Sequence, residues 1–244
     1  HRGARPAIEG NDVWDNLWDG IEISGIGTEP LLRGNRILGS VSVALYVWMG
    51  ATPEIEGNEI WAGKLPAILV RDSGTNPVIL ANRVHGGSRV GIAVDVGARP
   101  RLESNEIWPL SAPPFEESGR LRTTNSETRG VLFHYEGSGK VEILAPTGHD
   151  VAESTTWSVE SAGIAIHGAG TEPLVRANRI HDCDGAGIAV GSGAAPLIEE
   201  NEISRSAKSG IRVSGPGTRA VIRANEIVGC SGSGILVHDG ASPL

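Results

Sequence analysis

The chain lacks the features that mark several large classes of protein. No apolar run approaches the ~20 residues that a membrane-spanning helix requires, and no segment has the form of a signal peptide. Basic residues are the minority, with 21 lysines and arginines against 29 aspartates and glutamates, so nothing indicates a nucleic-acid-binding surface. No stretch repeats its apolar residues at helical spacing over the length of a helix. These absences predict a mildly acidic, all-β protein that binds neither nucleic acid nor membrane.

The chain does have an asparagine that recurs every 23 or 24 residues. An aliphatic residue lies three positions before each asparagine and another lies two positions after it, and a Gly-Ile-x-Val segment or a close variant follows. A fixed period of this length is typical of a stacked solenoid. The eight asparagines are Asn11, Asn35, Asn58, Asn82, Asn105, Asn178, Asn201 and Asn225.

Each repeat is predicted to contain three short strands. Apolar and polar residues alternate within each short run, as they do in strands, and glycine and proline separate the runs. In the repeat of Asn201 the inward residues are Ile198, Ile203 and Ile211. No coil can bury its apolar face alone, so stability has to come from stacking. We therefore predict an all-β solenoid of about ten coils, in which the asparagines form a hydrogen-bonded ladder at ~4.8 Å spacing.

The charges beside the asparagines alternate in sign from coil to coil. The position that follows the asparagine is Asp12, Arg36, Glu59, Arg83, Glu106, Arg179 and Glu202 in turn, and Glu226 breaks the pattern. Opposite charges should therefore lie side by side on neighbouring coils. Exposed pairs of this kind stabilise a fold little, so we interpret them as part of the stacking lattice and not as catalytic groups.

The repeat is interrupted between Asn105 and Asn178. This interval has almost the length of three coils, so we predict three coils here, two of them irregular, with Ser154 at one asparagine position. The predicted domain covers residues 1–244, with irregular or inserted coils at 109–153. Both ends of the sequence fall within a coil and carry no polar cap, which solenoids need. We therefore interpret the chain as a piece of a longer protein.

The only two cysteines, Cys183 and Cys230, both come five residues after their asparagine. They should share a column two coils apart, a separation of ~9.6 Å at strand spacing, which exceeds the reach of a disulfide. Two free thiols fit a reducing compartment and favour the cytoplasm.

Two spans, residues 172–182 (EPLVRANRIHD) and 195–203 (APLIEENEI), resemble the right-handed parallel β-helix repeats of the pectin-lyase-like superfamily. Their rhythm is similar to that of the β-helix region of the F-box-only proteins and its bacterial relatives. The resemblance covers nearly the whole chain except residues 109–153, and it implies a single right-handed parallel β-helix. The superfamily includes lyases, hydrolases and epimerases of polysaccharides as well as protein-binding modules. No F-box is present, so a ubiquitin-ligase role is not implied.

In the enzymes that these repeats resemble, the catalytic residues usually lie on the outer face of one column of strands. This is often the column that corresponds to the Gly-Ile-x-Val segments of this chain. This face alone combines side chains that do not repeat, and departures from repetition are where a binding surface would be encoded. The predicted binding residues are Tyr46, Trp48, Arg71, Asp95, His134 and His167. If the chain is an enzyme, Asp95, His134 and His167 are the acid–base candidates, with Arg71 to bind a uronate carboxylate. No clustered set of acids suggests calcium, and we expect neither a metal nor a cofactor.

A second column, three residues after the asparagine position, is mostly aromatic or histidine. Exposed aromatic rings suit sugar rings or a protein partner, but the repeats that this chain resembles also favour such residues there, so we interpret the column as a structural cover of the corner. Its members are Trp14, Leu38, Trp61, His85, Trp108, Trp157 and His181.

Two functions remain open from the sequence. The first is a non-catalytic recognition or scaffold module that presents one face to a protein or glycan partner. The regular lattice and the small outward residues Ala93, Ala165 and Ala189 favour it. The alternative is a lyase, hydrolase or epimerase that acts on uronate polysaccharides. We expect no turnover of such polymers.

Overall fold

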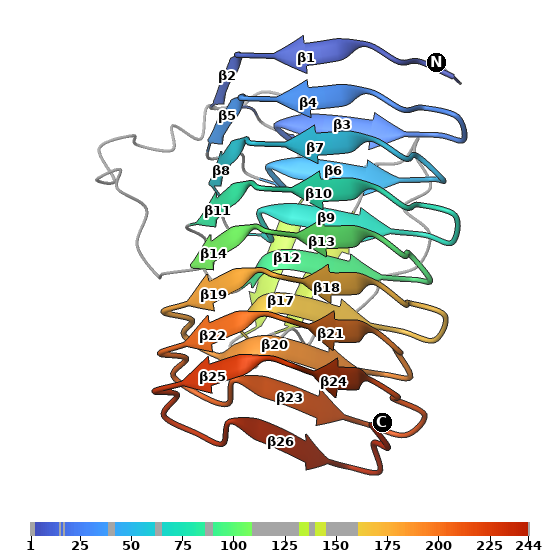
Figure 1. Ribbon diagram of the computed structural model, residues 1–244. Helices are drawn as coiled ribbons and strands as arrows, with labels where there is room; N and C mark the ends of the chain where they lie inside the picture. The colour runs from blue at the N-terminus through green and yellow to red at the C-terminus, as the bar shows by residue number, and fades with distance from the viewer. Residues whose placement is uncertain are drawn as a thin grey trace. The chain divides into compact units, whose positions relative to one another are not determined.

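A computed structural model describes residues 3–14, 16, 18–38, 42–61, 65–85, 90–108, 132–136, 140–144 and 161–243. The chain divides into two compact units, residues 1–113 with 161–244, and residues 114–160. In the first unit, short strands stack coil upon coil into a parallel β-helix (Figure 1). The described residues contain no helix that could span a membrane.

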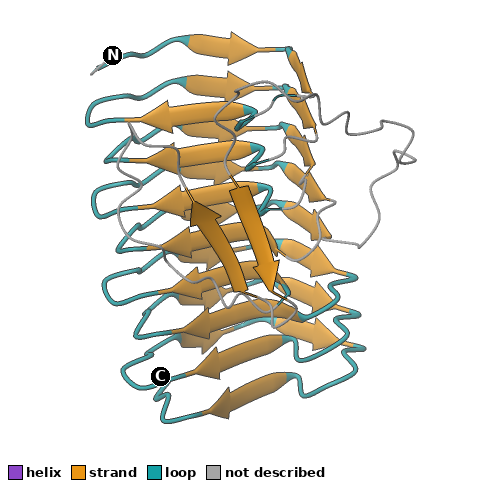
Figure 2. Cartoon of the chain, turned by 180° about the vertical axis from the view of Figure 1, so that it is seen from behind, coloured by secondary structure: helices purple, strands orange, loops and turns teal. Residues whose placement is uncertain are grey.

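Each coil of the β-helix contributes one strand to each of three parallel sheets, and each sheet has eight strands. The first sheet contains β1 (Ala7–Glu9), β4 (Leu31–Arg33), β7 (Glu54–Glu56), β10 (Val78–Leu80), β13 (Arg101–Glu103), β18 (Leu174–Arg176), β21 (Leu197–Glu199) and β24 (Val221–Arg223). The second sheet contains β2 (Asp12–Trp14), β5 (Arg36–Leu38), β8 (Glu59–Trp61), β11 (Arg83–His85), β14 (Glu106–Trp108), β19 (Arg179–His181), β22 (Glu202–Ser204) and β25 (Glu226–Val228). The third sheet, seen from behind in Figure 2, contains β3 (Ile21–Ser24), β6 (Leu45–Trp48), β9 (Ile68–Arg71), β12 (Val90–Asp95), β17 (Ala162–His167), β20 (Ala186–Gly191), β23 (Ile211–Ser214) and β26 (Ile235–His238).

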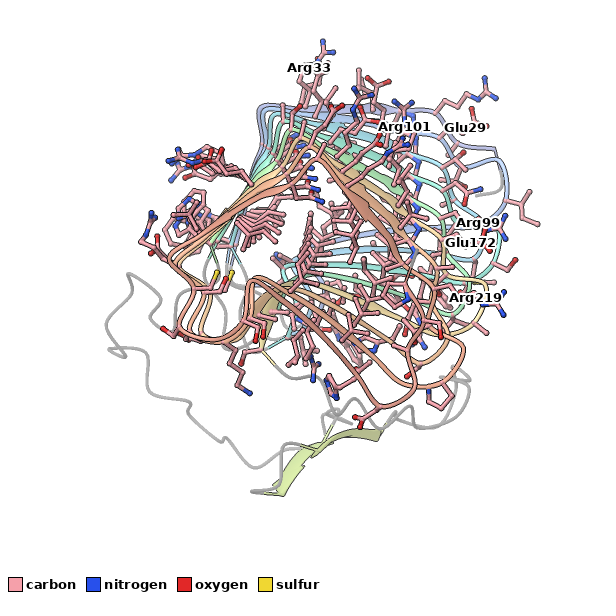
Figure 3. The ribbon with its side chains drawn as sticks, turned by 60° about the horizontal axis from the view of Figure 1, so that its bottom comes forward. Glu29, Arg33, Arg99, Arg101, Glu172 and Arg219 are labelled. Carbon is pink, nitrogen blue, oxygen red and sulfur yellow. The ribbon has the colours of Figure 1, made fainter. Side chains whose placement is uncertain are left out.

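The core is a stack of aliphatic side chains between the three sheets. Ile55, Ile60 and Ile68, one from each sheet of the same coil, have no exposed surface, and the same positions are buried in the neighbouring coils. Figure 3 shows the interior filled by such side chains, whereas the labelled Arg33 and Arg101 of the first sheet point outward. Removing this apolar area from water is the main stabilising contribution, and it accounts for the predicted alternation within each strand.

The asparagine ladder is confirmed. Nδ2 of each asparagine except Asn225, the last, donates a hydrogen bond to Oδ1 of the asparagine in the next coil, at 2.9 to 3.1 Å along the column. The same oxygen also accepts the backbone N–H of the preceding asparagine, as Asn58 Oδ1 accepts that of Asn35 at 2.9 Å. The backbone groups of these turns are buried where water cannot reach them, and the asparagine side chains provide their hydrogen-bond partners.

The coil count predicted from the sequence is wrong. Asn105 donates directly to Oδ1 of Asn178 at 3.0 Å, and β13, β14 and β12 pair directly with β18, β19 and β17. The described residues therefore form eight coils instead of about ten, and the coils of Asn105 and Asn178 are direct neighbours. Ser154, predicted at an asparagine position, lies outside the described residues. The alternation of charge permits either one or three steps across this interval, and the length alone favoured three.

The extra length lies between β14 and β17. Its described part is an antiparallel hairpin of β15 (Leu132–Glu136) and β16 (Lys140–Leu144) in the second unit. The rest of 109–153 lies outside the described residues, and the assignment of residues 1–244 to one domain stays a prediction.

Neighbouring coils approach each other closely at the glycine that begins the third-sheet segment in several coils. A Cβ atom on Gly187 would lie 2.7 Å from the carbonyl oxygen of Gly210 and 2.4 Å from Cγ2 of Ile203. The same distance of 2.7 Å to the next glycine carbonyl recurs at Gly91, Gly163 and Gly210. Only glycine leaves room for an approach this close. Ala44 and Ala67 take the equivalent position in the coils of β6 and β9, so glycine is required in particular coils and not in all of them.

Candidate functional site

The outer face of the third sheet brings five of the six predicted residues together. Arg71 and Asp95 are register partners on β9 and β12, and Trp48 pairs with Ser24 on the preceding coil. His167 follows Ile166, the register partner of Val94, so it continues the row beyond Asp95. Tyr46 lies two residues before Trp48 on the same face of β6. We call Tyr46, Trp48, Arg71, Asp95 and His167 the third-sheet row.

Tyr46 and Trp48 form a pair of stacked rings. Their centroids are 5.3 Å apart and their planes differ by 7°. Trp48 Nε1 donates a hydrogen bond of 2.8 Å to Oε1 of the exposed Glu22 on β3, which fixes the indole. Burial raises the pKa of Tyr46 to about 12, although the hydrogen bond and positive charge of Arg71 act in the opposite direction. The Tyr46 hydroxyl is therefore a neutral partner of Arg71 at physiological pH.

Arg71 and Asp95 form an ion pair that is largely removed from water. Arg71 Nε lies 3.4 Å from Asp95 Oδ1, and the two side chains are 16% and 7% exposed. Burial raises the pKa of Asp95 to about 7; the Arg71 charge opposes this shift and the negative charge of Asp72 adds to it. Desolvation outweighs the attraction of the nearby cation, as happens when a carboxyl is deeply buried. Asp95 is therefore a carboxyl that exchanges its proton near neutral pH.

One further feature sets Asp95 apart. Its buried Oδ1 atom has no hydrogen-bond partner among the described residues, and an unsatisfied buried oxygen reduces stability. The left-handed φ of 51° at Val96, the next residue, belongs to the turn that the coils share, because Met49, Asp72 and Ser192 have φ values of 53°, 78° and 54° at the same position.

The two histidines have different positions. His167 is half-buried on β17, and its Nδ1 lies beside its register partner Gly191, where a Cβ atom would be 3.2 Å away. His134 belongs to β15 of the second unit, opposite Glu142 in the hairpin. The structure places Asp95 and His167 in one row, whereas the predicted convergence of His134 with them stays a prediction.

Four members of the third-sheet row, Tyr46, Trp48, Arg71 and His167, are half-buried, and Asp95 is buried. Ala93, Ala165 and Ala189 occupy other outward positions on β12, β17 and β20, and all three are buried.

The aromatic column of the second sheet is a continuous row of rings in contact, tilted at Trp61 and His85 and stacked from His85 to His181. Successive centroids from Trp61 to His85, Trp108 and His181 are 3.6, 4.4 and 5.6 Å apart. Because the rings cover one another and His85 is 4% exposed, few ring faces are left for a ligand, which favours the structural interpretation. Trp157 lies outside the described residues, and Trp108 contacts His181 directly.

Two acidic residues of the site were not among the predicted binding residues. Glu22 holds Trp48, and Asp72 raises the pKa of Asp95 while its Oδ2 accepts the backbone N–H of Met49 at 3.2 Å. Glu22 and Tyr46 are register partners at an outward position of their strands, and this alternation, visible in the sequence, could have identified Glu22. No group of three or more metal-ligating side chains occurs in the part of the chain that the structure describes.

Comparison with known proteins gives one match. Residues 2–113 and 115–244 match the family model of the right handed beta helix region. No curated protein and no solved structure matches the chain. The similarity to F-box-only proteins that the repeat rhythm suggested is not confirmed.

Proposed function

Because the chain belongs to the right-handed β-helix family, we propose that its third sheet is a non-catalytic recognition surface for a glycan chain. The observation that carries this proposal is the third-sheet row itself. A stacked pair of rings, a guanidinium, a carboxyl and an imidazole follow one another along the axis of the helix, one coil apart. Coils repeat at ~4.8 Å, so the row offers successive contacts to an extended polymer.

The side chains of the row suit sugar rings. Tyr46 and Trp48 present apolar ring surface together with a hydroxyl and an indole N–H, a combination found where one side of a contact is apolar and the other is wet. Arg71 adds donors in a fixed planar arrangement. The outward columns of the other two sheets carry alternating charges or rings that cover one another. The third-sheet row therefore differs from the lattice in the way that a binding surface requires.

A second candidate function is acid–base catalysis on the same glycan, which the pKa of about 7 at Asp95 favours. A catalytic acid has to reach the atom that it protonates, whereas the Asp95 side chain is 7% exposed and faces Arg71. This geometry suits the positioning of Arg71 better than proton transfer to a sugar. We therefore keep recognition as the proposed function.

The proposal is tested by calorimetric titration with oligosaccharides of polygalacturonate, alginate, xylan and cellulose. Trp48→Ala should weaken binding of the preferred oligosaccharide at least about tenfold, the equivalent of about 1.4 kcal/mol. Trp14→Ala is the matched control, because Trp14 is a 66% exposed tryptophan of the second sheet, and it should leave the affinity unchanged. An equal loss in both variants, or no binding by any oligosaccharide, would contradict the proposal.

The same oligosaccharides distinguish recognition from catalysis. Prolonged incubation should yield no unsaturated ends, no released sugars and no inverted residues. Turnover that Asp95→Asn abolishes would replace the recognition surface with an enzyme active site.

A further inference from the structure

The exposed carboxylate of Glu22 lies beside the ring pair of the third-sheet row. Glu22 on β3 is the register partner of Tyr46 on β6, so the two side chains leave the same face of the sheet. Its Oε1 accepts the 2.8 Å hydrogen bond from Trp48 Nε1, and its other oxygen, Oε2, accepts none among the described residues. Because the side chain is exposed, Oε2 is open to a ligand that reaches the rings.

The hydrogen bond from Trp48 to Glu22 fixes the orientation of the indole. In the register of β3 and β6, Trp48 stands opposite Ser24, so its N–H reaches diagonally to Glu22 on the preceding coil. Without this bond the indole could turn about its side-chain torsions. The planes of Tyr46 and Trp48, which now differ by 7°, would then no longer be held parallel. Glu22 therefore acts on the ring pair through Trp48.

The charges around the ring pair are mainly negative. On the coils that follow, Asp72 and Asp95 act on the Tyr46 hydroxyl with negative charge and Arg71 acts with positive charge. Asp95 lies 3.4 Å from Arg71 Nε and opposes that cation directly. Even with Asp95 protonated, the carboxylates of Glu22 and Asp72 outnumber the guanidinium of Arg71. An acidic sugar at the rings would therefore meet net repulsion.

We propose that Glu22 is a positioning and specificity-determining residue, which holds Trp48 for stacking and selects a neutral glycan. The inference rests on the proposed function and gives it a substrate class, a sugar chain without acidic groups. A carboxylate oxygen only accepts hydrogen bonds, so Oε2 binds the hydroxyl groups of a sugar, and the charge strengthens these bonds. The sequence suggested Arg71 as the partner of a uronate carboxylate, but Asp95 already faces that guanidinium.

The first test compares tetrasaccharides from xylan and cellulose with tetrasaccharides from polygalacturonate and alginate by calorimetric titration. At low salt the unmodified protein should bind the preferred neutral sugar at least about fivefold more tightly than either acidic one. Added salt should strengthen binding of the acidic sugars and so narrow this difference, because it screens repulsion between exposed charges. Acidic sugars that bind as tightly as the neutral ones at low salt, or that weaken with salt, would overturn the proposal.

Two variants of Glu22 separate its charge from its hydrogen bond to Trp48. Glu22→Gln keeps an acceptor oxygen for the indole but removes the charge, so the acidic sugars should come within about twofold of the neutral ones. Glu22→Ala also removes the acceptor, so it should weaken binding of the neutral sugar about tenfold. The near-ultraviolet circular dichroism of the ring pair should change in Glu22→Ala and persist in Glu22→Gln. A merely structural role of Glu22 would not alter the preference between neutral and acidic sugars.

Glu54→Gln is the matched control. Glu54 is an exposed glutamate of β7 in the first sheet, away from the ring pair. Its substitution removes the same charge from the protein and should leave the preference for the neutral sugar unchanged. An equal change in the two glutamine variants would show that net charge sets the preference. Binding of the neutral sugar by Glu22→Gln that is as weak as by Glu22→Ala would show that Glu22 does not act through Trp48. Either result would contradict the proposal.

Failure of this proposal is distinguishable from failure of the proposed function. If acidic and neutral sugars bind equally well at low salt and both depend on Trp48, glycan recognition stands and the role of Glu22 is wrong. If no oligosaccharide binds, both are wrong.

Discussion

The asparagine ladder and the Arg71–Asp95 pair are both buried polar arrangements, but only the ladder repeats. Asn58 accepts two hydrogen bonds from Asn35 and donates to Asn82 and to two backbone carbonyls, so its amide is fully used. Asp95 has one partner charge, at 3.4 Å, and a buried oxygen without a hydrogen bond among the described residues. A neutral amide can be satisfied by its own copies in neighbouring coils, whereas a single buried charge cannot.

This difference indicates that the ladder stabilises the fold, whereas the Arg71–Asp95 pair does not. A buried polar group that is completely hydrogen-bonded supports the structure, and one that is not lowers stability. The repeating part of the chain should therefore be sensitive to substitution, and the third-sheet row should be tolerant or even gain stability when its charge is removed.

Substitution of a glycine at a close contact between coils should have the largest of these effects. Gly187→Ala places a methyl group 2.4 Å from Ile203 Cγ2 and 2.7 Å from the Gly210 carbonyl oxygen, and neither neighbour can move freely. We expect a loss of about 3 kcal/mol or more, as for an overpacked core, measured by chemical denaturation.

Gly234→Ala is the matched control for this substitution. It occupies the equivalent position in the coil of β26, but its added methyl group would meet only Ile227, at 3.8 Å. It should cost less than about 1 kcal/mol. Equal losses at the two glycines would show that the close approach of the coils is not the reason for the glycine.

Removing one amide of the ladder should have the next largest effect. Asn58→Ala leaves the Leu32 carbonyl and the backbone N–H of Asn35 without their side-chain partners in the buried turn. Each lost partner of a buried group costs about 1–3 kcal/mol, so we expect a loss of about 2–3 kcal/mol in chemical denaturation. Asn11→Ala, at the exposed first position, should cost clearly less, and the opposite order would contradict the ladder.

The repeating part of this structure could be predicted from the sequence because the same residue types return at the same spacing. The asparagine register alone gives the ladder and the parallel pairing, and the alternation of Glu59, Arg83 and Glu106 gives the ion pairs between coils. The alternation does not fix how many coils lie between Asn105 and Asn178, because one step and three steps give the same signs.

The site was predicted less completely because its properties depend on packing. The alternation of inward and outward residues along each strand placed Arg71 and Asp95 on one face. The burial that raises the pKa of Asp95 cannot be recognised in the sequence. The hydrogen bond from Trp48 to Glu22 joins residues 26 positions apart on different coils. Such pairs become visible only when the register between coils is known.

Removing the charge of Asp95 should increase stability, and by an amount that depends on pH. The folded protein binds the Asp95 proton with a pKa of about 7, against the ordinary value of 3.8, so ionisation favours the unfolded chain. The stabilisation that this proton affinity provides is complete below about pH 4 and is lost as the pH rises through about 7. Asp95→Asn should therefore be more stable than the unmodified protein at pH 8, by ~1–4 kcal/mol.

The control for this prediction is the same pair of proteins at pH 4, where their stabilities should be nearly equal. The melting temperatures of both, measured from pH 4 to pH 8, give the complete difference curve. A variant that is less stable at pH 8 would show that attraction to Arg71 outweighs the desolvation of Asp95.

The exposed ion pairs of the lattice should matter least. Arg33 Nη2 lies 2.6 Å from Glu56 Oε2 on the outer face of the first sheet, but water and salt screen both side chains. Exposed pairs contribute little because ordering two long side chains offsets most of the attraction. Glu56→Ala should therefore shift the melting temperature by less than about 2 °C, and added salt should reduce even this shift. Glu56 lies two residues before Asn58, so the two alanine variants compare the outside and the inside of the same turn. A shift for Glu56→Ala as large as that for Asn58→Ala would mean that register is held by the charges and not by the amide ladder.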